Sequence, residues 1–198
     1  WRVGIEAGYR GRVAMYDPQL EIAHHAPLKP FTTVRPDGRR LRVCFVSQTL
    51  PPAVPGGIGR YVRDVATELA ARGHEVRIVT DGSGHSTVDF EDGVWVHRIV
   101  KESDEPVPED LPTVPARIWA NAAAVADEVD RIAHVAPLDA VYAPMWDVEG
   151  LAVFGRSSVP VVTSVMTTMA ITLRTRPEWR EDAALFEAMA GPLLELER

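Results

Sequence analysis

The pattern of apolar residues becomes regular from Leu41 onward. The run LRVCFVS at 41–47 is β-branched and aromatic, which is typical of a buried strand. Runs of the same kind predict further strands at 75–80, 94–100, 138–143 and 159–165. Apolar and polar positions alternate in VWVHRIV at 94–100, so we expect that strand to be the more exposed one.

Two longer segments repeat their apolar residues every three or four positions, which predicts amphipathic helices. The apolar face of the first helix comprises Ile58, Val62, Val65, Ala66 and Leu69. The second helix follows Pro115, and its apolar face comprises Ile118, Ala122, Val125, Val129 and Ile132. Gly73 stands where a helix C-terminus favours a left-handed residue. We also expect a surface loop at 101–114, a short helix at 149–155 and a polar helix at 178–197.

Strands that alternate with helices predict an α/β domain over residues 41–198. Its expected architecture is Rossmann-like, with three layers and a mainly parallel sheet. Residues 1–40 contain several prolines and show no sustained period, so we interpret them as an N-terminal extension or linker with one short strand near 12–16. His24 and His25 have no further ligands at metal spacing, and we interpret them as a solvent-exposed pair.

The composition narrows the range of functions. A net charge of −7 over 198 residues argues against a nucleic-acid partner, which needs a basic face. Of the 21 basic residues only Lys29 and Lys101 are lysine, which indicates a GC-rich genome or, alternatively, arginines selected for phosphate contacts. The single cysteine, Cys44, lies in an apolar run, which favours a core residue and a cytoplasmic location.

The sequence does not indicate a membrane-spanning helix. It also favours a fragment over a complete protein. No apolar stretch reaches the ~18 residues that a spanning helix needs, so membrane association is not indicated. Because the chain opens with Trp1, we interpret it as a piece of a longer protein.

In a parallel sheet the carboxyl ends of the strands meet at one edge, where ligands bind near the topological switch point. Topology therefore selects loops that follow the predicted strands as the candidate site. These loops are 47–59, 81–86, 144–149 and 166–170.

The first loop, SQTLPPAVPGGIG at 47–59, is rich in proline and glycine and precedes a long helix. Gly56 and Gly57 can take positive φ and lack a Cβ, so a ligand can approach the main chain closely. The helix that begins near Ile58 adds unpaired N–H groups and a partial positive charge, which predicts an anion site. A turn that merely reverses the chain is the alternative.

A dinucleotide site is a weaker hypothesis for the same loop. Asp81 lies 22 residues after Gly59, much as in dinucleotide-binding folds. However, the glycines read G-G-x-G rather than G-x-G-x-x-G, and eight residues separate Ser47 from Gly56. We therefore favour a simple anion site over the binding of NAD or FAD at this loop.

The third loop, APMWDVEG at 143–150, combines an aromatic surface with carboxylates. Trp146 can pack against the CH face of a polyhydroxylated ligand, while Asp147 and Glu149 accept hydrogen bonds from its hydroxyl groups. In the alternative interpretation, Trp146 packs against the sheet and Glu149 favours a helix N-terminus. In the fourth loop Thr167 and Thr168 supply hydroxyls, either to the site or as local caps.

Several familiar catalytic motifs are absent from the sequence. It contains no Asp-x-Asp pair, no His/Cys cluster at metal spacing, no G-x-S-x-G elbow and no P-loop lysine. We therefore predict no metal and no bound cofactor. We also expect that the reactive groups of any enzyme are not all present in this chain.

Residues 41–80, LRVCFVSQTLPPAVPGGIGRYVRDVATELAARGHEVRIVT, resemble the opening of glycosyltransferase family 4, a large family of retaining GT-B enzymes. The shared features are a strand, an extended loop with the pair Gly56-Gly57, a helix that ends in LAARGHEV, and a second strand. LDAVYAPMWDVEGLAVF resembles the fourth-strand region of that family, and VPVVTSVMTT resembles the strand that follows. The resemblance covers about residues 41–198.

The resemblance implies that this chain, with a C-terminal GT-B domain in cis, binds a nucleotide-sugar donor and a sugar, lipid or small-molecule acceptor. The nucleotide sugar is then a co-substrate, its diphosphate leaves without a metal, and the catalytic residues belong to the C-terminal domain, which is absent here. The donor phosphate is assigned to Gly56, Gly57 and Arg60. The lining of the acceptor-side cleft is assigned to Trp146, Asp147, Glu149 and Thr167.

Two features depart from the family pattern. The strand before TT often ends in histidine in the family, whereas Met166 stands at that position here. The Glu-x7-Glu element of the second domain is missing, and we interpret the matching spacing of Glu187 and Glu195 as coincidence. We therefore expect no turnover by this chain alone. A non-catalytic Rossmann-like binding module and an NAD-dependent oxidoreductase or epimerase domain are the alternatives.

Overall fold

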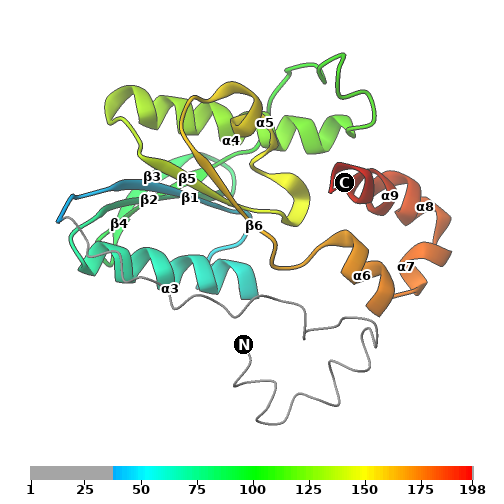
Figure 1. Cartoon of the computed structure of the whole chain (residues 1–198), viewed down its shortest axis with the longest axis horizontal. Helices are drawn as coiled ribbons and strands as arrows, with labels where there is room; N and C mark the ends of the chain where they lie inside the picture. The colour runs from blue at the N-terminus through cyan, green and yellow to red at the C-terminus, as the bar shows by residue number, and fades with distance from the viewer. Residues whose placement is uncertain (1–37, 198) are drawn as a thin grey trace, which may run out of the picture. The chain divides into compact units, whose positions relative to one another are not determined.

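The computed structural model describes residues 38–197, with Asp147 described by its main chain alone. The strand predicted near 12–16 and the pair His24 and His25 lie outside these residues, as does nearly all of the predicted extension 1–40. From Arg40 onward the chain forms one α/β unit. Its helices cover both faces of a six-stranded, mainly parallel sheet (Figure 1). The predicted fold class is confirmed.

The order of the strands in the sheet is β3-β4-β2-β1-β5-β6. Their bounds are β1 Arg42–Ser47, β2 Glu75–Asp81, β3 Thr87–Glu91, β4 Val94–Ile99, β5 Ala140–Pro144 and β6 Val161–Ser164. β1 lies inside the sheet, where Phe45 pairs in parallel register with Ile78 of β2 and with Tyr142 of β5. The chain leaves β1 toward β2 and later returns to the other side of β1 as β5. The topological switch point therefore lies between β1 and β5.

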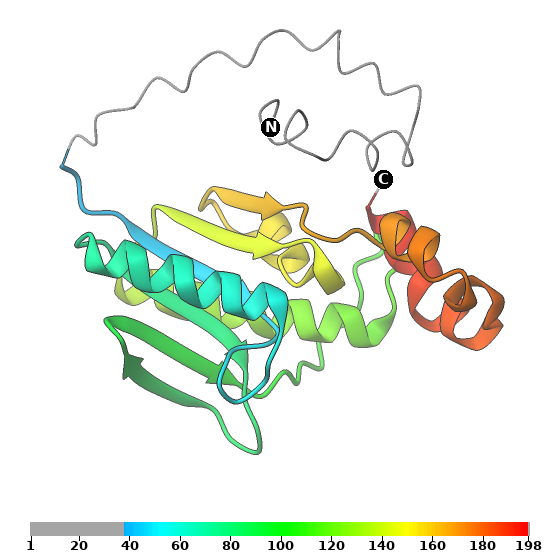
Figure 2. The same ribbon diagram turned by 90° about the horizontal axis from the view of Figure 1, so that it is seen from below.

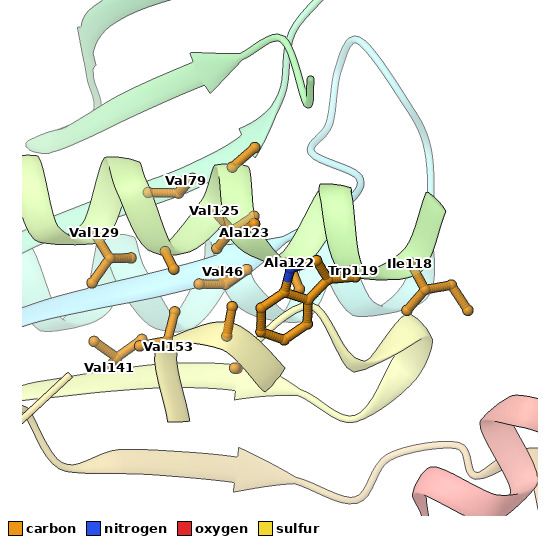
Figure 3. Packing of buried hydrophobic residues seen from close by; sticks show 14 of the residues in the cluster. Val46, Val79, Ile118, Trp119, Ala122, Ala123, Val125, Val129, Val141 and Val153 are labelled. Carbon is orange, nitrogen blue, oxygen red and sulfur yellow. The ribbon is translucent and has the colours of Figure 1, made fainter. Parts of the chain in front are cut away.

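Two long helices cover opposite faces of the sheet. α3 (Gly57–Ala71) lies on one face and α4 (Ala116–Val135) on the other, as Figure 1 shows. Val62 and Ala66 of α3 pack with Phe45 and Ile78. On the other face, α4 contributes Ala122, Val125 and Val129 to a larger cluster, drawn in Figure 3. The buried positions follow the apolar stripes that the sequence predicts, because each helix is oriented by burial of its apolar face.

The end of α3 agrees with the sequence prediction. Gly73 has a φ of +90°, a conformation that costs other residues roughly 1–2 kcal/mol. Its N–H donates to the carbonyl of Ala70 at 2.9 Å, and the N–H of His74 donates to that of Leu69 at 3.1 Å. These are the two hydrogen bonds of a Schellman motif, and they direct the chain into β2.

The β3–β4 hairpin is the main element that the sequence analysis missed. β3 runs antiparallel to β4, and the turn consists of Asp92 and Gly93, with φ of 49° and 85°. Asp-Gly between two apolar runs is a strong hairpin signal, so this turn was predictable. The expectation of an exposed strand at 94–100 was wrong, because α3 and α4 cover the two faces of the sheet at β4 and bury most of its side chains. The buried side chains of β4 are Val94, Val96, His97 and Ile99.

The predicted polar helix at 178–197 is interrupted once, at Asp182, and from Ala183 to Leu196 it continues without a break through a π-helical turn. It consists of α7 (Glu178–Glu181), α8 (Ala183–Leu185), η4 (Phe186–Ala190) and α9 (Gly191–Leu196), preceded by the unpredicted α6 (Met169–Thr175). Asp182 has extended backbone after α7, and its side chain accepts a hydrogen bond from the N–H of Leu185 at 3.0 Å. Figure 2 shows these helices beyond the carboxyl ends of β5 and β6. Among the helices of residues 38–197, none is long and apolar enough to cross a membrane.

Candidate functional site

A cavity of about 190 Å³ opens at the carboxyl edge of the sheet, at the switch point between β1 and β5. Three segments form its walls: the chain after β1, the start of α3 and the chain after β5. The lining residues are Ser47, Gln48, Thr49, Gly56, Gly57, Ile58, Pro144, Trp146 and Glu149. The start of α3 and the end of β5 lie at the same edge in Figure 2. The glycine loop and the tryptophan loop therefore share one cavity, as their positions after β1 and β5 predict.

The glycines of the first loop have different structural tasks. Gly56 is extended, with a φ of −170°, and neither Gly56 nor Gly57 has the positive φ that the sequence analysis considered. A Cβ on Gly56 would lie 2.7 Å from Thr49 Oγ1, and a Cβ on Gly59 would lie 2.1 Å from the Thr49 carbonyl oxygen. These two glycines let α3 pack against Thr49. A Cβ on Gly57 would meet nothing within 4 Å, so Gly57 is the glycine that borders open space.

The start of α3 presents main-chain N–H groups near this cavity. No side chain caps the helix, and its first turn contains no acidic residue. The N–H of Arg60 donates to the carbonyl of Gly56 at 2.9 Å, so the N–H groups of Gly57 and Ile58 precede the first bond of the helical ladder. The helix dipole adds a partial positive charge at this wall. The arrangement is suited to an anion.

The chain after β5 supplies an aromatic and acidic wall. Trp146 begins the short helix η3 (Trp146–Val148), and α5 (Leu151–Arg156) follows. Trp146 is half-buried and lines the cavity, whereas the carboxylate-bearing Glu149 is only 4% exposed. The main chain of Asp147 lies in η3, and its side chain lies outside the described part of the structure.

Lys101, which the sequence analysis did not assign to the site, contacts Glu149. Its Nζ pairs with Glu149 Oε1 and lies 2.5 Å from Asp81 Oδ1. Burial alone would lower the pKa of Lys101, but the charges and hydrogen bonds of Glu149 and Asp81 outweigh burial and raise it above its ordinary value. Lys101 therefore stays charged. Its position two residues after the end of β4, and so near the carboxyl edge of the sheet, is the sequence signal that could have identified it.

Other predicted site residues do not line the cavity. The side chain of Arg60 is 81% exposed, and its Nε lies 3.9 Å from Asp64 Oδ2. Thr167 is half-buried outside the cavity walls. Its neighbour Thr168 caps α6 by accepting a hydrogen bond from the N–H of Ile171 at 3.2 Å, as the local-cap alternative predicts. Met166 accepts a hydrogen bond at its Sδ from the Tyr142 hydroxyl at 3.9 Å.

A larger hollow of about 470 Å³ lies along η4 and α9. Its walls include Phe186 and Leu194, and also Glu187 and Glu195, whose spacing the sequence analysis noted. No strand end contributes to these walls. We therefore take the smaller cavity as the candidate site, because it joins two strand ends to an uncapped helix start.

The chain is similar to glycosyltransferases over most of its length. A family model described as glycosyl transferase 4-like domain matches residues 56–195. A D-inositol 3-phosphate glycosyltransferase from Arthrobacter sp. is 31% identical over 166 residues, which cover 73% of this chain and 38% of the relative. A glycogen synthase from Mycobacterium tuberculosis is 37% identical over 73 residues, which cover 33% of this chain and 17% of the relative.

A solved structure shares the fold. Sucrose-phosphate synthase from Thermosynechococcus elongatus superposes with a TM-score of 0.56 at 13% identity, over 77% of this chain and 39% of that chain. The matched region thus spans less than half the length of each of these proteins.

Proposed function

Because the chain belongs to the glycosyl transferase 4-like domain family, we propose that it is the acceptor-side domain of a retaining glycosyltransferase. The whole enzyme transfers a sugar from a nucleotide-sugar donor to a sugar, lipid or small-molecule acceptor. One observation carries this proposal: Gly57 and Trp146 line the same cavity at the switch point between β1 and β5, where parallel α/β sheets bind ligands. The binding-module and NAD-dependent alternatives are not favoured, because the matching family and the curated relatives are transferases.

The walls of the cavity suit different parts of such a ligand. In our proposal the donor phosphate approaches the start of α3, where Gly57 leaves the main chain accessible, and Arg60 reaches it from the rim. Trp146 packs against the CH face of a sugar, and Glu149 accepts a hydrogen bond from a hydroxyl group. Asp147 and Thr167 extend the same cleft on the acceptor side.

The size of the cavity supports a two-domain enzyme. A volume of about 190 Å³ is below the roughly 300–1,000 Å³ of small-molecule sites. We therefore assign the rest of the cleft, most of the donor contacts and the catalytic residues to a C-terminal GT-B domain in cis. In this proposal the diphosphate leaves without a metal, and the enzyme works in the cytoplasm, where a lone buried thiol such as Cys44 stays reduced.

The 198-residue chain alone is expected to show no sugar transfer and weak or no binding of UDP- and GDP-sugars by calorimetry. The physical reason is that one domain supplies only part of the cleft. The same chain joined in cis to its C-terminal GT-B domain is expected to release UDP or GDP in an acceptor-dependent assay. Transfer by the chain alone, well above background, would refute the two-domain assignment.

The substitution Gly57→Leu tests the cavity itself. The fold should tolerate the new side chain, because a Cβ at this position meets nothing within 4 Å, but the side chain would occupy space that the ligand needs. We expect kcat/KM of the two-domain enzyme to fall at least about tenfold, with Tm within about 2 °C of the wild type.

Gly155→Leu is the matched control for this substitution. Gly155 also has open space around its Cβ, and it does not line the cavity, so this variant should keep full activity. If Gly57→Leu keeps full activity as well, the cavity is not the ligand site.

A further inference from the structure

Residues at or after the ends of three strands meet at one buried ammonium group. Lys101 follows β4, Asp81 is the last residue of β2, and Glu149 lies in the turn after η3. The side chains of Lys101 and Glu149 are 8% and 4% exposed, whereas that of Asp81 is 40% exposed. Of these three residues only Glu149 lines the cavity. The ion cluster therefore reaches the candidate site through a single carboxylate.

This cluster is an inefficient way to stabilise a fold. Moving each charge out of water costs several kcal/mol, and the attraction between the partners offsets that cost only when the geometry is good. One ammonium faces two carboxylates, so a net negative charge is left over. Well-packed apolar side chains often stabilise such positions as well or better. The placement of the cluster behind a cavity wall therefore calls for a functional explanation.

The effect of Lys101 on Glu149 provides such a functional explanation. Loss of the ammonium would remove a charge that favours the ionised form of Glu149, whereas burial and the nearby Asp81 carboxylate favour the protonated form. The ammonium in contact with Glu149 favours the ionised form of its carboxyl group and fixes its orientation. A carboxylate has about four acceptor positions on its two oxygens, so it can bind Lys101 and still accept a ligand hydroxyl.

Lys101 also limits the negative charge near the start of α3. The same cavity is lined by Gly57 and Ile58, where an anion is favoured. An uncompensated carboxylate at Glu149, in the wall of this cavity, would repel a phosphate group. The ammonium of Lys101 offsets the charge of Glu149 and so makes this wall compatible with an anionic ligand.

We propose that Lys101 is a positioning residue that holds Glu149 ionised and oriented in the cavity wall, so that Glu149 accepts a hydrogen bond from a hydroxyl of the ligand. This inference rests on the proposed function, because the ligand is the nucleotide sugar or its acceptor. Its first consequence, however, is measurable on the chain without any ligand.

The ligand-free test is a pH titration of the Glu149 carboxyl group by ¹³C NMR in the 198-residue chain. In Lys101→Met the pKa of Glu149 is expected to exceed the wild-type value by about one to three pH units, the usual effect of losing a close opposite charge. Lys101→Met/Asp81→Asn answers the same question if the single variant does not fold, because it also removes the second acid. An unchanged pKa of Glu149 in the folded variant would overturn the proposal.

Arg156→Met is the matched control for this titration. Arg156 also lies between two carboxylates: it pairs with Glu105, and its Nη1 lies 3.1 Å from Asp127 Oδ1. Arg156 does not line the cavity, so its loss should leave the pKa of Glu149 unchanged. An equal shift in Arg156→Met would mean that a general change in charge or stability moves this pKa, and it would also overturn the proposal.

The second test uses the two-domain enzyme with UDP-glucose and GDP-mannose as donors. We expect kcat/KM to fall about tenfold in both Lys101→Met and Glu149→Gln, the effect of losing one hydrogen bond to a charged group. The double variant should be no worse than Glu149→Gln, because Lys101 acts through Glu149. Independent, additive losses would overturn the inference. If the wild-type enzyme transfers no sugar, the proposed function fails, while the ligand-free titration still decides the role of Lys101.

Discussion

Replacing Gly59 with alanine is expected to lower the free energy of unfolding by about 2–3 kcal/mol. Gly59 is buried in the first turn of α3, and a Cβ there would lie 2.1 Å from the carbonyl oxygen and 2.7 Å from the carbonyl carbon of Thr49. These are main-chain atoms, so no rotation of a side chain relieves the overlap. The Thr49 carbonyl also accepts a hydrogen bond from Ser47 Oγ at 2.7 Å, so moving it disturbs the end of β1 as well.

Urea denaturation of Gly59→Ala and Gly155→Ala at neutral pH measures this effect. Gly155 lies in α5, where a Cβ would meet nothing within 4 Å, so its replacement should be neutral or slightly stabilising, as alanine is favoured in helices. Equal midpoints for the two variants would show that α3 does not depend on close contact with Thr49.

The largest pH effect is expected at Glu128, in a cluster with His97 and Arg131. Glu128 Oε1 lies 2.5 Å from His97 Nδ1, and Arg131 donates to both carboxylate oxygens of Glu128, at 2.6 and 2.7 Å. Burial by itself would raise the pKa of Glu128, but the hydrogen bonds and charges of Arg131 and His97 outweigh it and lower the pKa to about 2. The ionised carboxylate is therefore much preferred in the folded state.

Because the folded-state pKa lies below the ordinary value of 4.5, this stabilisation is present above about pH 4.5 and is lost as the pH falls toward 2. We expect Glu128→Gln to lower the free energy of unfolding by about 2–3 kcal/mol at pH 7. The difference between this variant and the wild type should shrink steadily between pH 4.5 and 3. Denaturation series at several pH values measure both effects.

Glu68→Gln is the matched control for Glu128→Gln. Glu68 of α3 pairs with Arg72, the residue that follows the helix, at 2.8 Å, but the Glu68 side chain is 62% exposed. Such surface pairs contribute about 0.3–0.5 kcal/mol. If the two variants lose equal stability, or if the loss at Glu128 is the same at pH 3 as at pH 7, the Glu128 cluster does not stabilise the fold through the carboxylate charge.

The glycine loop shows how far sequence patterns reach into the candidate site. The position of the loop between a strand and a helix predicted a place at the carboxyl edge, and the structure agrees. The pattern did not separate the tasks of Gly56, Gly57 and Gly59, because the difference depends on where Thr49 lies. Residue type alone is identical at all three positions.

Lys101 shows a second limit of prediction from sequence patterns. Its partner Glu149 is 48 residues away along the chain, and no periodic pattern connects the two. The acidic and proline-rich composition of 101–114 predicted a surface loop. That prediction fits most of the segment but not its first residue, Lys101, whose side chain is buried. A lysine two positions after the last residue of β4 lies at the strand edge, where packing with neighbouring loops decides its environment.

By itself, the sequence determined the principal strands and the two long helices, the glycine stop of α3, and the family to which the chain belongs. These features depend on local periodicity, on backbone preferences of single residues and on contiguous motifs. Only the tertiary structure decided the order of the strands, the edge position of β3, the ion cluster of Lys101 and the meeting of Gly57 with Trp146. Those features bring together residues that are far apart in the chain. Their energies depend on distances between side chains in the folded protein, which the sequence alone does not give.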